Sequence, residues 1–116
     1  MGAWMSMDIL PRYDEEEPNR PVLVWHRYQG AVLAGALTLR QNRYNAAWME
    51  IPDEWIDMRE RRPTKEDADQ YGCVLVRHRN GDIRIQSYNP RLWSERYECW
   101  MRLPERPAGE GTRTGK

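Results

Sequence analysis

The chain lacks an excess of charge of either sign. Its 116 residues include 18 lysines and arginines and 18 aspartates and glutamates, so the net charge is zero. This balance excludes a chain built as a polycation for nucleic acid or anionic lipid. No apolar run approaches the roughly 20 residues that a membrane-spanning helix needs. We therefore expect no membrane partner, in a chain long enough for one domain.

Cysteine is also scarce, with only Cys73 and Cys99 present. Two cysteines cannot build a disulfide framework, and the N-terminus has no basic segment followed by an apolar stretch. These features predict a cytoplasmic protein, in a bacterium or an infected host. The sequence has no glycine-rich phosphate loop, no Gly-x-Ser-x-Gly and no His-Glu-x-x-His motif, so we expect no catalytic residues and no cofactor.

What the chain does contain is an internal repeat with a period of 52 residues. The segment 22–27, VLVWHR, aligns with VLVRHR at 74–79, and WMEIP at 48–52 aligns with WMRLP at 100–104. Eight of 31 aligned positions are identical, where chance gives roughly two. We predict two copies of one unit, about 1–53 and 54–106, in a single domain over 1–106. Residues 107–116 are predicted to form a disordered tail.

Each copy has the pattern of a three-stranded antiparallel unit. VLVRHR and IRIQSY flank Asn80-Gly81 and predict a β-hairpin, with the same hairpin turning near Gln29-Gly30 in the first copy. RYECWMRL and RYNAAWMEI predict a third strand in each copy. Thr64 before a charged run and Gly72 after it predict one short helix at 65–71. The predicted fold is mainly β, with α+β as the alternative, in which two pseudo-symmetric three-stranded units share one core.

Three segments of the second copy, over residues 54–107, have counterparts in a protein family. They are EWIDMRERRP, GCVLVRHRNGDIRIQSY and CWMRLPERP. They resemble domain-of-unknown-function family 551, a short module frequent in phage and prophage genes. Its members open with Trp-Ile-x-Val-x-x-Arg-x-Pro, continue with Val-Leu-Val and close on His-Trp-Met-Pro-Leu-Pro-Glu-Pro-Pro. The matching residues are Trp55, Ile56, Arg61, Pro63, Val74, Leu75, Val76, Trp100, Met101, Leu103, Pro104, Glu105 and Pro107. Cys99 and Arg102 depart from the pattern, standing where the family has His and Pro. The resemblance implies a mobile-element protein and transfers no activity.

Strand alternation indicates a candidate protein-binding surface. Trp48 shares a strand face with Glu50, and Trp100 shares one with Arg102, so these indoles are expected to be half-buried opposite an aliphatic core face. The first copy has Trp25 where the second has Arg77, and a position that accepts both is expected near solvent. An exposed patch of tryptophan and arginine is typical of protein interfaces. The candidate binding residues are Trp25, Trp48, Arg77, Arg79, Arg84 and Trp100. The alternatives are that the third-strand indoles seal the sheet and that Trp25 packs onto the other copy.

The function expected first is non-enzymatic binding of a host or phage protein. The concrete version is a phage or prophage accessory protein that inhibits a host defence complex, in the manner of an anti-CRISPR protein. A homodimer is a further possible assembly.

Two other functions stay open. Residues 1–58 hold nine acids and five bases, whereas residues 59–116 hold nine acids and thirteen bases, so an arginine-rich second half could serve a nucleic-acid-associated module. The third is a metal- or thiol-dependent enzyme. It would use His26, His78, Cys73 and Cys99 as a zinc site, or Cys99 with His78 as a nucleophilic pair.

Overall fold

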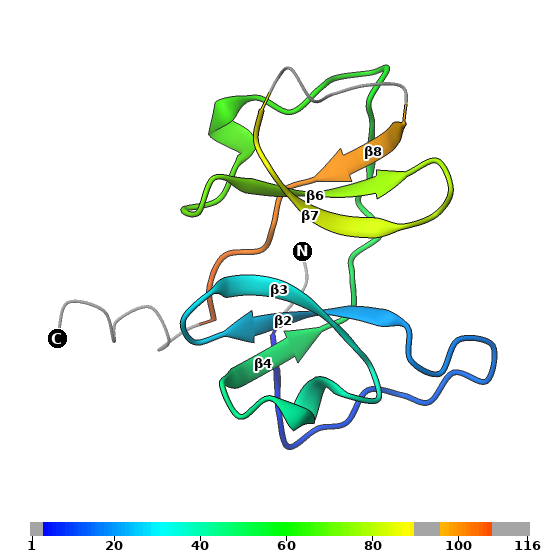
Figure 1. Ribbon diagram of the computed structural model, residues 1–116, viewed down its shortest axis with the longest axis vertical. Coiled ribbons are helices and arrows are strands. Elements are labelled where there is room, and N and C mark those ends of the chain that lie inside the picture. The colour runs from blue at the N-terminus through cyan, green and yellow to red at the C-terminus, as the bar shows by residue number, and fades with distance from the viewer. Residues whose placement is uncertain (1–3, 90–95, 108–116) are drawn as a thin grey trace, which may run out of the picture. The chain divides into compact units, whose positions relative to one another are not determined.

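The computed structural model describes residues 4–89 and 96–107 and divides the chain into two units, shown in Figure 1. Unit 1 comprises Met1–Ile51 with Pro104–Lys116, and unit 2 comprises Pro52–Leu103. The boundary after Ile51 lies close to the predicted junction between the two copies. The predicted disordered tail lies outside the described residues, apart from Pro107. The single core shared by both copies stays a prediction.

Each unit is a four-stranded antiparallel sheet, so the predicted mainly β fold class is confirmed. In unit 1 the order is β1-β4-β2-β3, from β1 (Met5–Ser6), β4 (Asn45–Met49), β2 (Pro21–His26) and β3 (Gly30–Gly35). In unit 2 the order is β5-β8-β6-β7, from β5 (Ile56–Asp57), β8 (Tyr97–Met101), β6 (Cys73–His78) and β7 (Ile83–Ser87). The prediction of three strands per copy missed β1 and β5, because two-residue strands are too short to show alternation.

The two units share details that the repeat predicted. Both hairpins turn at a glycine with positive φ, Gly30 at 78° and Gly81 at 97°. The register shifts at one equivalent point in each sheet, between Trp25 and His26 and between Arg77 and His78. His26 and His78 therefore occupy matching positions at the ends of β2 and β6.

The predicted helix over 65–71 is wrong beyond its first turn. The structure has a 3-10 turn at η2 (Lys65–Asp67), and Ala68 is already extended. Unit 1 also has a 3-10 turn, η1 (Leu39–Gln41), but at a different position in the repeat. The Asp69 carboxylate accepts the backbone N–H groups of Tyr71 and Cys73, at 2.9 and 3.0 Å, which competes with helical hydrogen bonds. Within the described residues no helix is long and apolar enough to cross a bilayer. The described residues form 3-10 turns and no α-helix, so the α+β alternative is not adopted there.

The tryptophan face of each third strand is a core face, contrary to prediction. Trp48 packs with Val22 and Val24 in unit 1, and Trp100 packs with Val74 and Val76 in unit 2. The intervening aliphatic residues of the opposite face are buried as well, including Leu23, Met49, Leu75 and Met101. Strands β2 and β6 are thus buried on both faces, which accounts for their unbroken Val-Leu-Val sequences.

Candidate functional site

The predicted aromatic–arginine patch is not formed, because its tryptophans are buried. Trp25 is 6% exposed, Trp48 4% and Trp100 0%. The indole N–H of Trp48 donates to the carbonyl of Ile9 at 2.6 Å, and that of Trp100 donates to the carbonyl of Arg61 at 2.7 Å. A buried indole needs such an acceptor, and here each indole has one at the same sequence distance. These three residues therefore belong to the interior.

The position shared by Trp25 and Arg77 accepts both residues for a reason other than exposure. Trp25 meets the ring of Trp4 edge-on, with the ring centroids 6.0 Å apart. The Arg77 guanidinium lies 5.0 Å from the centroid of the Trp55 ring. Trp4 and Trp55 precede equivalent short strands, and an indole face or edge accepts an aromatic ring and a guanidinium alike. The inference of a solvent-facing position was wrong for Trp25.

The predicted arginines make their contacts within unit 2. Arg77 also pairs with Glu98 at 3.4 Å, and Arg84 pairs with Asp82 at 3.5 Å beside the hairpin turn. The backbone N–H of Arg79 donates to the carbonyl of Arg96 at 2.8 Å. The arginine charges of β6 and β7 are thus matched by acidic neighbours within unit 2.

The charge difference between the chain's halves also disappears when it is counted by unit. Unit 1 has eight acidic and eight basic residues, and unit 2 has ten of each. The basic excess of residues 59–116 came from placing the acids at 53–57 in the first half and the basic tail in the second. Neither unit is a cationic module.

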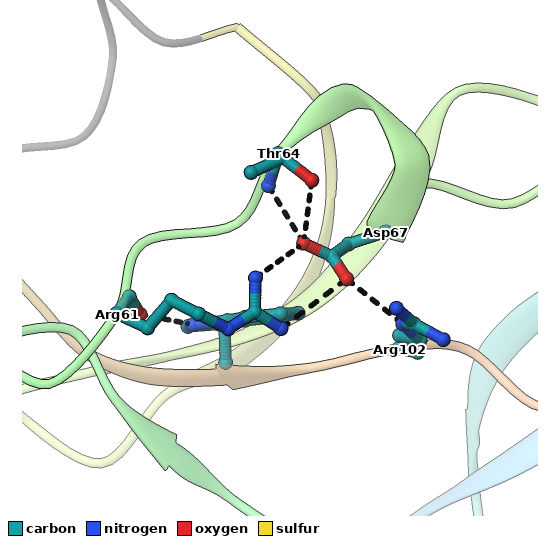
Figure 2. A network of polar contacts seen from close by, with 5 residues as sticks. Arg61, Thr64, Asp67 and Arg102 are labelled. Carbon is teal, nitrogen blue, oxygen red and sulfur yellow. Dashed lines mark hydrogen bonds and ion pairs between the residues drawn. The ribbon is translucent and has the colours of Figure 1, made fainter.

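A buried carboxylate in unit 2 is surrounded by hydrogen-bond donors, as Figure 2 shows. Asp67 is 3% exposed, and its side chain is approached by Arg61 from one side and by Arg102 from the other. Arg61 donates two hydrogen bonds, of 2.9 and 3.3 Å, and Arg102 donates one of 2.8 Å. The backbone N–H and the hydroxyl of Thr64 donate at 2.7 and 2.9 Å. We call these four residues the Asp67 cluster.

The Asp67 cluster keeps its carboxylate ionised at neutral pH. The hydrogen bonds from Arg61 lower the pKa of Asp67 far below its usual range, against the opposing effect of burial, with further help from Thr64 and Arg102. A general base or acid works best with a pKa near the operating pH. Asp67 is therefore suited to fastening the 60–68 loop to the end of β8, not to moving protons.

Unit 1 has a groove where unit 2 has the Asp67 cluster. The groove is open and holds about 770 Å³, between the 8–20 loop and β4. Its apolar lining includes Ile9, Leu10 and Tyr13, which are 49%, 62% and 65% exposed. The remaining lining residues are Met5, Arg12, Asp14, Glu15, Glu16, Arg20, Trp48 and Glu50. We call this feature the unit 1 groove.

The groove and the cluster occupy equivalent places in the repeat. The indole hydrogen bonds align Ile9 with Arg61. The hydrogen bonds from Ala36 N–H to Arg20 carbonyl and from Tyr88 N–H to Gly72 carbonyl align Arg20 with Gly72. The loops between these points have equal lengths, so Glu15 stands at the position of Asp67 and Glu50 at that of Arg102.

Inside the groove, one carboxylate is already paired. Glu50 forms a two-pronged ion pair with Arg20, which also donates to the carbonyl of Arg12 at 2.8 Å. This pairing raises the pKa of Arg20. Among residues 4–89 and 96–107, the Glu15 carboxylate makes no hydrogen bond or ion pair.

Within the described residues the zinc site is not assembled, and Cys99 and His78, which lie on neighbouring strands, share no hydrogen bond. Cys73 begins β6 and His78 ends it, which separates them by roughly 16 Å along an extended strand. Over the described ranges, no three His, Cys, Asp or Glu side chains are placed to hold one metal ion. Burial raises the pKa of both Cys73 and Cys99, so neither is a ready thiolate.

Comparisons with protein-family models, with curated proteins and with solved structures give no match to this chain. The resemblance of the second copy to family 551 therefore stays a prediction.

Sequence reasoning missed both the cluster and the groove. Thr64 and Asp67 at a spacing of three were a visible signal of a capped turn, but Arg102 is 35 residues away and its partner was not apparent. The acidic run at 14–17 was not connected with its apolar neighbours. Exposed Leu10 and Tyr13 beside that run were the signal that could have marked the groove.

Proposed function

We propose that this chain is a non-enzymatic binding protein whose partner protein docks on the unit 1 groove. The observation that carries the proposal is the distribution of exposed apolar side chains. Among the described residues, six large hydrophobic side chains are markedly exposed, and five of them lie in unit 1. Ile9, Leu10 and Tyr13 line one groove, and apolar area rimmed by charge is typical of protein-binding surfaces.

A protein partner fits the charges better than a nucleic acid does. Carboxylates line the unit 1 groove and repel phosphate. In unit 2, Arg59 pairs with Asp57, and the arginines at 61, 77, 84 and 102 also have carboxylate partners. Phosphate contacts would have to compete with these internal pairs.

The polar groups with reactive potential favour binding over catalysis. The Asp67 carboxylate is engaged by five hydrogen bonds, and the thiols of Cys73 and Cys99 are held protonated by burial. A thiol-dependent enzyme would need a lowered cysteine pKa, the opposite of what burial produces here.

The setting that we propose is a phage or prophage accessory protein in the bacterial cytoplasm. The resemblance of residues 54–107 to family 551 supports a mobile-element origin. A small binding protein from such an element acts by covering a host surface, and an inhibitor of a defence complex, in the manner of an anti-CRISPR protein, is the concrete form of this function. The partner is then a host protein, with a phage protein or a second copy of the chain as the other outcomes.

The test compares two exposed leucines of the same unit. Leu10 is 62% exposed inside the groove, and Leu37 is 61% exposed outside it. We expect Leu10→Asp to reduce recovery of a cross-linked host partner by at least about tenfold, as loss of an interface anchor does. Leu37→Asp is expected to recover it like the parent. The readout is quantitative mass spectrometry with both variants matched for melting temperature.

A functional arm accompanies the binding arm. In a bacterium whose CRISPR defence targets a test phage, expression of the parent chain and of Leu37→Asp should restore plaque formation, and Leu10→Asp should not. Equal recovery of the partner by Leu10→Asp and the parent would contradict docking on the groove.

A further inference from the structure

We propose that the unit 1 groove binds an arginine side chain of the partner protein, in the place that Arg61 fills within unit 2. This inference rests on the proposed function and adds the chemistry of the contact. One unit closes the site with its own arginine, and the other leaves the equivalent site open to a partner.

Unit 2 supplies the template for the contact. The Arg61 guanidinium lies 4.8 Å from the centroid of the Trp100 ring and donates to both carboxylate oxygens of Asp67. Stacking on an indole combined with a two-pronged carboxylate contact is a geometry that guanidinium satisfies especially well. Figure 2 shows the Arg61 guanidinium facing the Asp67 carboxylate.

Unit 1 keeps the frame of this site but lacks its arginine. Trp48 lines the groove, and its indole donates to the backbone of Ile9 as Trp100 does to that of Arg61. The side chain at position 9 is aliphatic and half exposed, so it supplies no charge. Because Trp48 is only 4% exposed, an arginine in the groove would reach a small part of the indole and would be held mainly by the carboxylates.

The charges of the groove favour a cation. Four carboxylates and two guanidinium groups line it, and one carboxylate of that set, on Glu50, is already paired with Arg20. Glu15 stands at the position of Asp67, and within the described part of the chain its carboxylate has no polar partner. An incoming arginine would complete the pair that Asp67 and Arg61 form in unit 2.

The apolar rim indicates that the arginine arrives on a protein segment. Exposed Leu10 and Tyr13 line the same groove and would bury the residues that neighbour the arginine. Arginine is among the residues enriched in interface anchors, and lysine lacks the planar fork and the stacking surface.

The experiment follows the assigned Trp48 indole N–H signal of the isotope-labelled full chain by NMR. The probes are N-acetyl-L-arginine amide, the corresponding lysine amide and the citrulline amide, which keeps the shape of arginine without its charge. At constant ionic strength, we expect a saturable shift with arginine, with binding at least about fivefold weaker for lysine and for citrulline.

Two variants and one control test whether the arginine amide binds in the unit 1 groove. Glu15→Gln should weaken arginine binding by about two- to fivefold, as loss of a partly exposed ion pair does. Ile9→Arg restores the residue of the second copy, so it should fill the site from within and abolish the shift. Leu37→Arg adds the same charge outside the groove and should leave binding unchanged. Unchanged amide spectra outside the groove establish that each variant is folded.

The outcomes separate this inference from the proposed function. Equal binding of lysine and arginine, or undiminished arginine binding to Ile9→Arg, overturns the arginine site. If no probe moves the Trp48 signal while Leu10→Asp still loses the partner, the arginine site is wrong and the proposed function stands. If Leu10→Asp also keeps its partner, both fail.

Discussion

At the scale of single residues, Asp67 makes the stability of unit 2 depend on acid. Its pKa is lowered in the folded state, first by Arg61 and then by Thr64 and Arg102. A lowered folded pKa stabilises the protein above the unfolded value of about 3.9 and loses that contribution as pH falls toward the folded pKa. We therefore expect the free energy of unfolding to fall from pH 5 to pH 2 more steeply in the parent than in Asp67→Asn.

The measurement is urea unfolding at several pH values, with Glu66→Gln as the control. Glu66 is exposed and adjacent to Asp67, and it should keep the pH dependence of the parent. Parallel curves for the parent and Asp67→Asn would show that the Asp67 cluster does not contribute to acid sensitivity.

Positions 25 and 77 show what sequence reasoning can miss about a residue. The alignment identified Trp25 and Arg77 as equivalents, but it could not show that each packs on a second indole. Trp4 and Trp55 align only if one residue is gapped, and they lie 21 and 22 residues upstream. A mixed Trp and Arg position was therefore attributed to solvent when the cause is a shared stacking surface.

At the scale of elements, β8 and the residue that follows it are expected to respond unequally to substitution. Trp100→Ala should cost about 3–5 kcal/mol and Met101→Ala about 2–4 kcal/mol, because both side chains are buried. Arg102→Ala should cost less than about 1 kcal/mol, because its side chain is 67% exposed and Arg61 still pairs with Asp67. Denaturant unfolding in which Arg102→Ala is the most damaging of the three would contradict this ranking.

The elements were predictable to the extent that their signals are local. Asn80-Gly81 between two alternating segments identified the β6–β7 hairpin, and its repeat identified the β2–β3 hairpin. The capped start at Thr64 was predicted, but Asp69 ends the turn through side-chain bonds that no helix rule anticipates. The tryptophan faces of β4 and β8 were predicted to be half-buried because a neighbouring charge was taken as evidence of exposure. In fact Arg102 reaches Asp67, and Glu50 reaches Arg20.

At the scale of the whole molecule, the repeat predicts one core shared by both copies. Leu23 and Leu75 are 0% exposed and lie on the strand faces opposite Val22, Val24, Val74 and Val76. If the core is shared, Leu23→Ala in unit 1 should lower the unfolding midpoint of unit 2 by the same amount as that of unit 1. Hydrogen exchange of β2 and β6 amides through a denaturant series measures both. Separate midpoints for the two units would disprove the shared core.

The candidate site was less predictable than the fold, because it depends on how two equal loops differ. The 9–20 and 61–72 loops have the same length and the same indole anchor, but one has Ile9 and Glu15 where the other has Arg61 and Asp67. Sequence identity between the copies reveals the common frame. The open groove results from the differences between the copies at these positions. Such differences leave the hydrophobic periodicity of the sequence unchanged, so pattern analysis does not detect them.

Within the described residues, the Trp4–Trp25 pair gives unit 1 an optical property that unit 2 does not share. Two indoles with centroids 6.0 Å apart and planes inclined at 73° are close enough for their electronic transitions to couple, and their crossed orientation makes the coupled transitions chiral. In unit 2 the equivalent partner of Trp55 is Arg77, whose guanidinium has no near-ultraviolet absorption. The exciton signal of this pair in circular dichroism therefore reports the folding of one copy of a duplicated protein in the presence of the other.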